Sequence, residues 1–165
     1  MAADVKELLT ALETKQQLLG RLEDLLTQEQ QAITNLDLND LDRLDQQKRQ
    51  LLVQLEANSN STRQMIRSLA EQANLSPTAT LTPVIASLSS PQRDRCNELQ
   101  RALLQIGKRV DQLLDFNRQL LQTSLTTVTT SLDFFNRIFS RGGTYGDGGR
   151  MMSASTGVRL VSQEA

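Results

Sequence analysis

Few side chains in this 165-residue chain have the chemistry of catalysis or metal binding. It contains no histidine, which removes the commonest general base and most catalytic zinc sites. The single cysteine, Cys96, has no second thiol for a disulfide or a metal ion, which favours a reducing compartment. Asp40 and Asp42 lie at a predicted helix start, where carboxylates favour the positive end of the helix dipole. The run GGTYGDGG at residues 142–149 lacks the preceding strand and the Lys-Ser or Lys-Thr pair of a phosphate-binding loop.

Composition and charge exclude further classes of function. Eighteen Lys and Arg against nineteen Asp and Glu give a formal net charge of −1, so no basic excess is present for binding nucleic acid. No segment approaches the roughly 18 consecutive apolar residues that a membrane span requires, and the N-terminus lacks the features of a secretory signal. We therefore expect a cytoplasmic protein that is not an enzyme, with no catalytic residue, metal site, cofactor, nucleic-acid partner or stable membrane insertion.

The elements that position the remaining side chains are predicted by leucine-rich seams. Through three stretches, apolar residues recur at alternating steps of three and four, which is the spacing of a helix that packs on other helices. The seams predict helices at about residues 5–36, 39–74 and 91–140. The linker at residues 75–90 is rich in Ser, Thr and Pro and has room for one short extra helix.

Short polar motifs predict where these helices begin. Asp4 and Glu7 fit a capping box at the start of the first helix. Asp37 or Asn39 is expected to cap the second helix. Ser90, which a proline follows, is expected to cap the third helix.

The predicted fold class is all-α. We expect an elongated antiparallel hairpin or bundle of three long helices with coiled-coil-like packing, in which the short corner near Leu38 makes the first two helices antiparallel. With 38% hydrophobic but only 3% aromatic residues, the core must be aliphatic. One helical domain is expected over residues 1–139. A flexible tail is expected over residues 140–165, which hold six of the eight glycines.

Six polar residues interrupt the seams, and each could mark a ligand site or fix the register of the helices. They are Lys15, Glu29, Lys48, Asn58, Asn117 and Ser124. Because one buried polar residue penalises slipped pairings, we favour the register interpretation for all six. Asn117 is the best candidate for a second role, because the apolar stripe shifts by one residue near Leu121.

The C-terminal part of the third helix has two unusual features. Seven of the nine residues in TSLTTVTTS, residues 123–131, are Ser or Thr. Together they lack roughly 3 kcal/mol of helix propensity relative to Ala, so this segment should be only marginally helical without a partner. The following LDFFNRIF holds three of the four phenylalanines. There Leu132, Phe135 and Phe139 continue the core stripe, whereas Phe134 and Ile138 lie on a different face.

Two interpretations of this helix end stay open. Phe134 and Ile138 either plug the open end of the bundle or belong to a hydrophobic surface that receives another helix. The succession of a marginal helix, a two-faced apolar end and a glycine-rich tail favours binding by coupled folding. The candidate binding residues are Leu125, Val128, Leu132, Phe134, Phe135, Ile138 and Phe139.

Three stretches make the chain resemble the FlgN family of cytoplasmic flagellar type III export chaperones. They are LLTQEQQAI in the first helix, LNDLDRLDQQKRQLLVQLEA in the second, and NRQLLQTSLTTVTTSLDFFNRIF, which TYGDGG follows. The resemblance covers roughly residues 18–149. Its most specific part is the run from Asn117 to Leu125 followed by Tyr145 and Gly146.

The resemblance implies a chaperone that binds hook-filament junction (hook-associated) proteins, prevents their premature assembly and delivers them to the flagellar type III export apparatus. It implies that the C-terminal region binds the client and that Tyr145 docks on the cytosolic domain of the export gate. Residues 150–165 have no family pattern.

The main alternative is a structural coiled-coil adaptor or tether that uses the same seams for self-association. Such a protein would be an elongated stable oligomer. A chaperone would be a monomer or weak dimer that forms a stoichiometric complex with its client.

Overall fold

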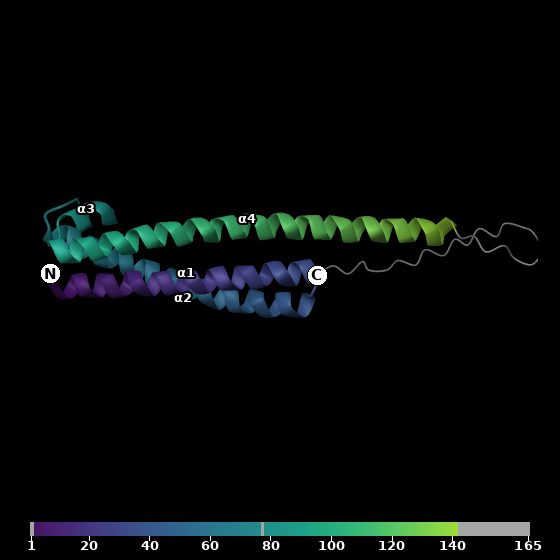
Figure 1. Ribbon diagram of the computed structural model, residues 1–165, viewed down its shortest axis with the longest axis horizontal. Coiled ribbons are helices and arrows are strands. Elements are labelled where there is room, and N and C mark those ends of the chain that lie inside the picture. Colours follow the sequence, from purple (N-terminus) through teal and green to yellow (C-terminus); the bar gives the residue numbers. More distant parts are fainter. Residues whose placement is uncertain (1, 77, 142–165) are drawn as a thin grey trace, which may run out of the picture. The chain divides into compact units, whose positions relative to one another are not determined.

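The computed structural model describes residues 2–76 and 78–141. In these residues the chain forms four helices (Figure 1): α1 (Ala2–Asn35), α2 (Leu38–Gln72), α3 (Leu81–Ala86) and α4 (Ser90–Arg141). Helix accounts for 91% of the described residues, and none of them is in a strand. The all-α fold with long packed helices is therefore confirmed, and α3 is the short extra helix for which the linker had room.

Of the three helix caps predicted from the sequence, one is confirmed and two are wrong. Asp37 is the N-cap of α2, because its side chain accepts a hydrogen bond from the backbone N–H of Asp40 at 3.0 Å. Helix α1 begins at Ala2, so Asp4 lies inside its first turn, where an acidic side chain favours the helix dipole, and is not the cap. Helix α4 begins at Ser90 itself, and the carbonyl of the preceding Ser89 accepts from the N–H of Arg93.

Helices α1 and α2 end in the same backbone conformation. Leu36 and Asn74 both have φ of 54°, the left-handed conformation that usually falls to glycine. After α1, the N–H of Asp37 reaches back to the carbonyl of Ala32 at 2.9 Å. After α2, the N–H of Leu75 reaches the carbonyl of Ala70 at 2.8 Å. These bonds satisfy carbonyls that a helix end otherwise leaves without a partner, and they turn the chain.

The described chain divides into two compact units between residues 122 and 123. In the first unit, α1 and α2 lie antiparallel (Figure 1). Two contacts show this direction. Lys48, early in α2, contacts Glu29, late in α1, and Asn58, later in α2, donates to the carbonyl of Ala11, early in α1. The part of α4 in this unit runs parallel to α1: Arg95 pairs with Glu13, and Arg109 pairs with Glu23.

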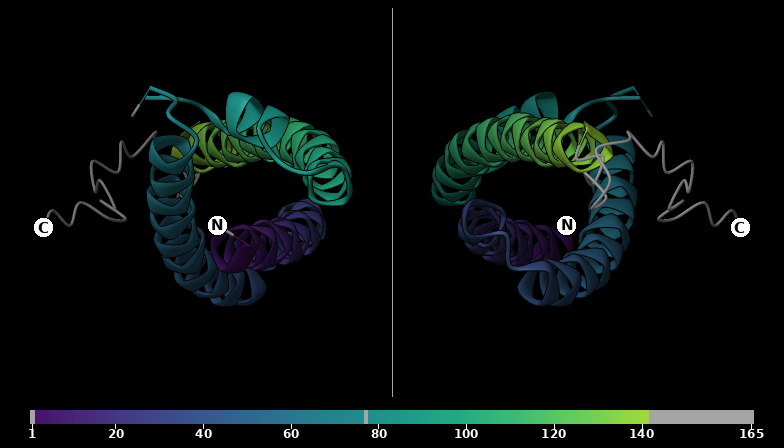
Figure 2. Two further views of the ribbon diagram at one scale, coloured as in Figure 1. Left: turned by 90° about the vertical axis from the view of Figure 1, so that its left-hand side faces the viewer. Right: turned by 90° about the vertical axis from the view of Figure 1, so that its right-hand side faces the viewer.

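Two aliphatic clusters form the core of the first unit. One joins Val5, Leu8 and Leu12 of α1 to residues of the other three helices, namely Leu69, Ala70, Val84 and Leu99. The other joins three leucines of α1 to residues of α2 and α4: Leu18, Leu22, Leu26, Leu51, Leu55 and Val110. Helix α3 lies beside the start of α4 (Figures 1 and 2) and contributes Val84 to the first cluster. The predicted aliphatic core is therefore built from α1, with α2 and α4 packed on it.

The second unit begins at Thr123, and its described part is helical through Arg141. The segment whose helix propensity is low thus belongs to the long helix α4.

Candidate functional site

The apolar side chains near the end of α4 are exposed. Five of them form what we call the seam face: Leu125, Val128, Leu132, Phe135 and Phe139. Two more form the flank face, Phe134 and Ile138. All seven are between 42% and 78% exposed. Isolated exposed apolar residues are ordinary, whereas a contiguous set of this size is unusual on a protein surface.

The seam face overlaps in helical position with the buried stripe earlier in α4, which shifts by one residue near Leu121. Val128 follows Val110 by eighteen residues, and Phe135 follows Leu99 by thirty-six, which correspond to about five and ten full turns. Val110 and Leu99 are only 4% and 3% exposed. The side of α4 that packs on the α1–α2 hairpin is therefore continued by the side that carries the seam face.

One expectation about this stripe is wrong. The sequence predicts that Leu132, Phe135 and Phe139 continue the core, but they are 58%, 53% and 78% exposed. Within the first unit, α4 contacts α1 as far as Asn117, which bonds to residues 26 and 29, and α1 ends at Asn35. The three exposed residues belong to the second unit.

The flank face bears on the two interpretations that the sequence left open. A plug of the bundle end would be buried, whereas Phe134 is 59% and Ile138 is 49% exposed. The rings of Phe134 and Phe135 meet edge to face, with centroids 5.9 Å apart and an interplanar angle of 66°. This contact places an aromatic side chain of one face against an aromatic side chain of the other.

Hydroxyl side chains of the Thr-rich segment are satisfied inside the helix. Thr127 donates to the carbonyl of Thr123 at 3.0 Å, and Ser131 donates to the carbonyl of Thr127 at 2.9 Å. Thr129 donates to the carbonyl of Leu125 at 2.9 Å. These hydroxyls already have acceptors, so a partner that covers them need not supply one.

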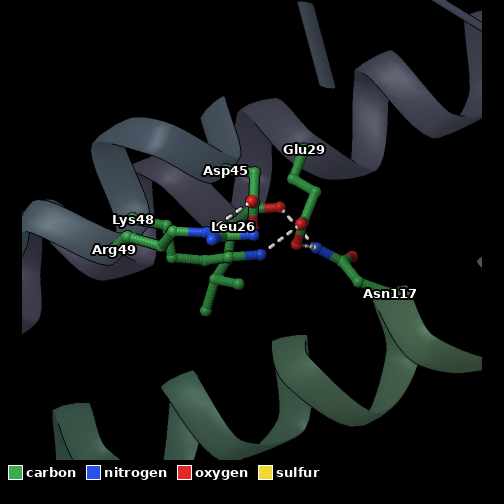
Figure 3. Close-up of polar contacts among 6 residues, drawn as sticks. All are labelled: Leu26, Glu29, Asp45, Lys48, Arg49 and Asn117. Carbon is green, nitrogen blue, oxygen red and sulfur yellow. Dashed lines mark hydrogen bonds and ion pairs between the residues drawn. The ribbon is translucent and has the colours of Figure 1, made fainter. Parts of the chain in front are cut away.

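A polar junction ties the three long helices together just before this surface (Figure 3). Lys48 of α2 contacts Glu29 of α1 at 2.5 Å. Asn117 of α4 donates through Nδ2 to Glu29 Oε2 at 3.0 Å and to the carbonyl oxygen of Leu26 at 2.7 Å. Asn117 is 4% exposed, and its Oδ1 has no hydrogen-bond partner in the described residues.

Four of the six polar seam residues form bonds between helices, as the register interpretation expects: Glu29, Lys48, Asn58 and Asn117. The other two, Lys15 and Ser124, are half-buried.

Salt bridges and burial shift several pKa values in the first unit. The hydrogen bond from Arg109 to Glu23, like those from Arg95 to Glu13 and Glu98, raises the pKa of the guanidinium. Burial raises the pKa of the Cys96 thiol, which is fully buried. A hydrogen bond from Gln72 is the main cause that lowers the pKa of Asp4. These are features of helix packing and bring no reactive group to the exposed faces.

Two other kinds of site are absent from the part of the chain that the structure describes. Within residues 2–76 and 78–141, no cluster of three or more His, Cys, Asp or Glu side chains could hold a metal ion. No helix in the same part of the chain is long and apolar enough to cross a membrane. Tyr145 and the glycine run around it lie outside the described residues.

Comparison with known proteins gives one match. A family model described as FlgN protein matches residues 1–153. No curated protein and no solved structure matches the chain.

Proposed function

The chain belongs to the FlgN family of flagellar export chaperones, and from this premise we propose that it binds hook-filament junction proteins before their export. In this proposal the chaperone covers the assembly surfaces of its client in the cytoplasm, prevents premature polymerisation and delivers the client to the type III export apparatus. It acts as a monomer or weak dimer and needs no nucleotide to hold its client.

The exposed seam face is the observation that carries this proposal. Its residues recur at the alternating steps of a seam that packs on a helix, and they occupy the side of α4 that elsewhere packs on α1. A client segment that becomes helical can cover Leu125, Leu132 and Phe139 as α1 covers the earlier part of the stripe. The client is therefore recognised as an added helix.

Binding to this surface is expected to be driven by apolar burial. Between Gln119 and Phe139 the only charged residues are Asp133 and Arg137. Covering apolar surface contributes about 25 cal/mol per Å², from which the cost of ordering the client and the Thr-rich segment is subtracted. The affinity should consequently depend little on salt concentration.

Delivery is assigned to Tyr145. Tyr combines a large apolar ring with a hydrogen-bonding hydroxyl, and the five glycines within residues 142–149 would let the chain fit that ring into a pocket of a partner. In the proposal this pocket belongs to the cytosolic domain of the export gate, as the family resemblance implies.

A titration tests the client-binding step. Purified protein is titrated by calorimetry with a purified hook-filament junction protein from the same bacterium. Leu125→Ser combined with Leu132→Ser should weaken the complex more than tenfold, because it removes apolar area from the seam face alone. Thr130→Ala, on the opposite side of the same helix, is the matched control and should bind as the unchanged protein does.

Two results would contradict the proposal. One is the absence of a stoichiometric complex with any junction protein. The other is a stable elongated oligomer without client that the Leu125→Ser and Leu132→Ser changes dissociate, because that is the behaviour of a coiled-coil tether.

A further inference from the structure

The apolar surface near the end of α4 is wider than one partner helix requires. A helix that faces one core usually carries an apolar stripe about 100° wide. The seam face and the flank face together span about 180° of the helix circumference at 100° per residue. Both Phe134 on the flank face and Phe135 on the seam face are more than half exposed. A single client helix on the seam face would leave the flank face in water.

We propose that this segment of α4 receives two helical segments of one client, with one segment on the seam face and the other on the flank face. The inference rests on the proposed chaperone function and defines the kind of client that fits: a chain with two amphipathic segments that pair as helices. A client with a single amphipathic helix would cover only half of the surface.

The seam of the earlier part of α4 packs against a pair of helices. Val110 belongs to a cluster that contains Leu18 and Leu22 of α1 as well as Leu51 and Leu55 of α2. Asn117 contacts Glu29 of α1, which in turn contacts Lys48 of α2. A pair of helices is therefore the established partner of the stripe that the seam face continues.

Two small residues beside Phe134 and Ile138 suit close packing. Thr127 and Ser131 lie on the flank side of the helix, and their small side chains leave room for a neighbouring backbone. Their hydroxyls donate to carbonyls four residues earlier at 3.0 Å and 2.9 Å. Burial between two client helices would therefore leave neither hydroxyl hydrogen without an acceptor.

A second copy of this chain fits the surface less well. A two-fold symmetric dimer presents the same patch of each copy to the other. Pairing through the seam face would leave Phe134 and Ile138 uncovered on both copies. Two segments of one client can cover the two faces together.

Site-specific photo-crosslinking tests the inference. The residue p-benzoylphenylalanine replaces Leu132 on the seam face and, in a separate protein, Phe134 on the flank face. A third protein carries it in place of Asp133, on the side of the helix opposite both faces. Each full-length protein is mixed with a purified hook-filament junction protein and irradiated, and the crosslinked peptides are identified by mass spectrometry.

The expected result is that positions 132 and 134 crosslink to two different segments of the same client chain, while position 133 crosslinks to neither. Crosslinks from both positions to one segment would overturn the inference. Crosslinks from position 134 to a second copy of this chain, or to nothing, would also overturn it. In each of these cases a crosslink from position 132 to the client leaves the proposed function standing. Only the absence of client crosslinks from both positions would contradict the proposed function as well.

An affinity measurement gives an independent check. The Phe134→Ser and Ile138→Ser double variant should lose more than tenfold in affinity for the intact client. Its affinity for the isolated client segment that crosslinks to position 132 should change less than twofold. An equal loss for the intact client and the single segment would show that both faces bind one helix, against the inference.

Discussion

Asn117 shows how a single polar side chain fixes three helices in one register. It lies on α4 and bonds to the carbonyl of Leu26 and to Glu29, which also contacts Lys48 of α2. Displacing α4 by one heptad would place Val110 or Ser124 at this junction and leave the α1 carboxylate without its amide donor. The cost of an unsatisfied buried group thus favours one alignment over its neighbours.

The first prediction concerns this junction. Asn117→Ala should lower the free energy of unfolding by about 1–3 kcal/mol, because two hydrogen bonds of a buried side chain are lost. Chemical denaturation measures the loss. Arg49→Ala is the control, because it removes only the exposed pair with Asp45 and should cost less than about 0.5 kcal/mol. Equal losses in the two variants would contradict a specific role for Asn117.

The second prediction concerns Cys96. Its side chain is fully buried, and burial raises the pKa of its thiol, so the reactive thiolate is scarce in the folded protein. Alkylation by iodoacetamide at pH 8 should be at least about tenfold slower in the native protein than in urea. The rate in the native protein should rise with pH as the thiolate forms. A native rate equal to the rate in urea would show that the start of α4 is not packed as described.

At the scale of the helices, sequence periodicity predicted where the elements lie but not how two of them end. Leu36 and Asn74 take the left-handed conformation that glycine usually adopts at a helix end. Because neither residue is a glycine, the sequence does not indicate this conformation at either position. The cap at Asp37 was predictable because its side chain makes a local bond to the N–H of Asp40. The starts at Ala2 and Ser90 were placed slightly late, because a favourable acid or proline suits several positions of a first turn.

The third prediction concerns the flank face. Phe134→Ser with Ile138→Ser should weaken client binding more than tenfold, or more than about 1.4 kcal/mol, while the melting temperature changes by less than about 2 °C. Both side chains are exposed, so little burial within the chain is lost. Calorimetric titration and thermal unfolding measure the two effects. A fall of several degrees in melting temperature with unchanged affinity would favour the plug interpretation instead.

The fourth prediction concerns the Thr-rich segment. Thr127→Ala, Thr129→Ala and Ser131→Ala together should add about 1–2 kcal/mol of helix propensity. Amide hydrogen exchange in residues 123–139 should slow. Client affinity should rise a few-fold, because the free-energy cost of ordering this segment on binding is smaller. Slower exchange combined with weaker binding would show instead that these hydroxyls donate hydrogen bonds to the client.

At the scale of the whole molecule, local patterns predicted the helices, while the relation between distant helices decided the candidate site. The residues of the seam face were recognised from their spacing. Their exposure belongs to the second unit, whereas the burial of the earlier stripe depends on contacts such as that of Asn117 with Glu29, across 88 residues. No local motif reports such an alignment, and the same apolar spacing in α4 is compatible with a buried stripe or an exposed one.

The fifth prediction separates client binding from delivery. Tyr145→Ala should leave the affinity for the junction protein unchanged, because the seam face and flank face are untouched, and should reduce export of that protein. Calorimetric titration measures the first effect, and the amount of junction protein in the culture medium measures the second. Tyr145→Phe, which keeps the ring, is the matched control for the apolar part of the contact. Weaker client binding by Tyr145→Ala would place this residue in the client site.

The order of contacts along the chain has a consequence for how the protein is made. Glu29 and Lys48, which join α1 to α2, are 19 residues apart, whereas Arg109 and Asn117 reach back to α1 across 86 and 91 residues. At 5–20 residues per second, a ribosome would complete α2 roughly 3 to 10 s before it reaches Thr123. The hairpin can therefore fold first and serve as a template on which α4 aligns. The apolar faces emerge after the hairpin has formed, and this order shortens the time in which a half-made chain exposes them to aggregation.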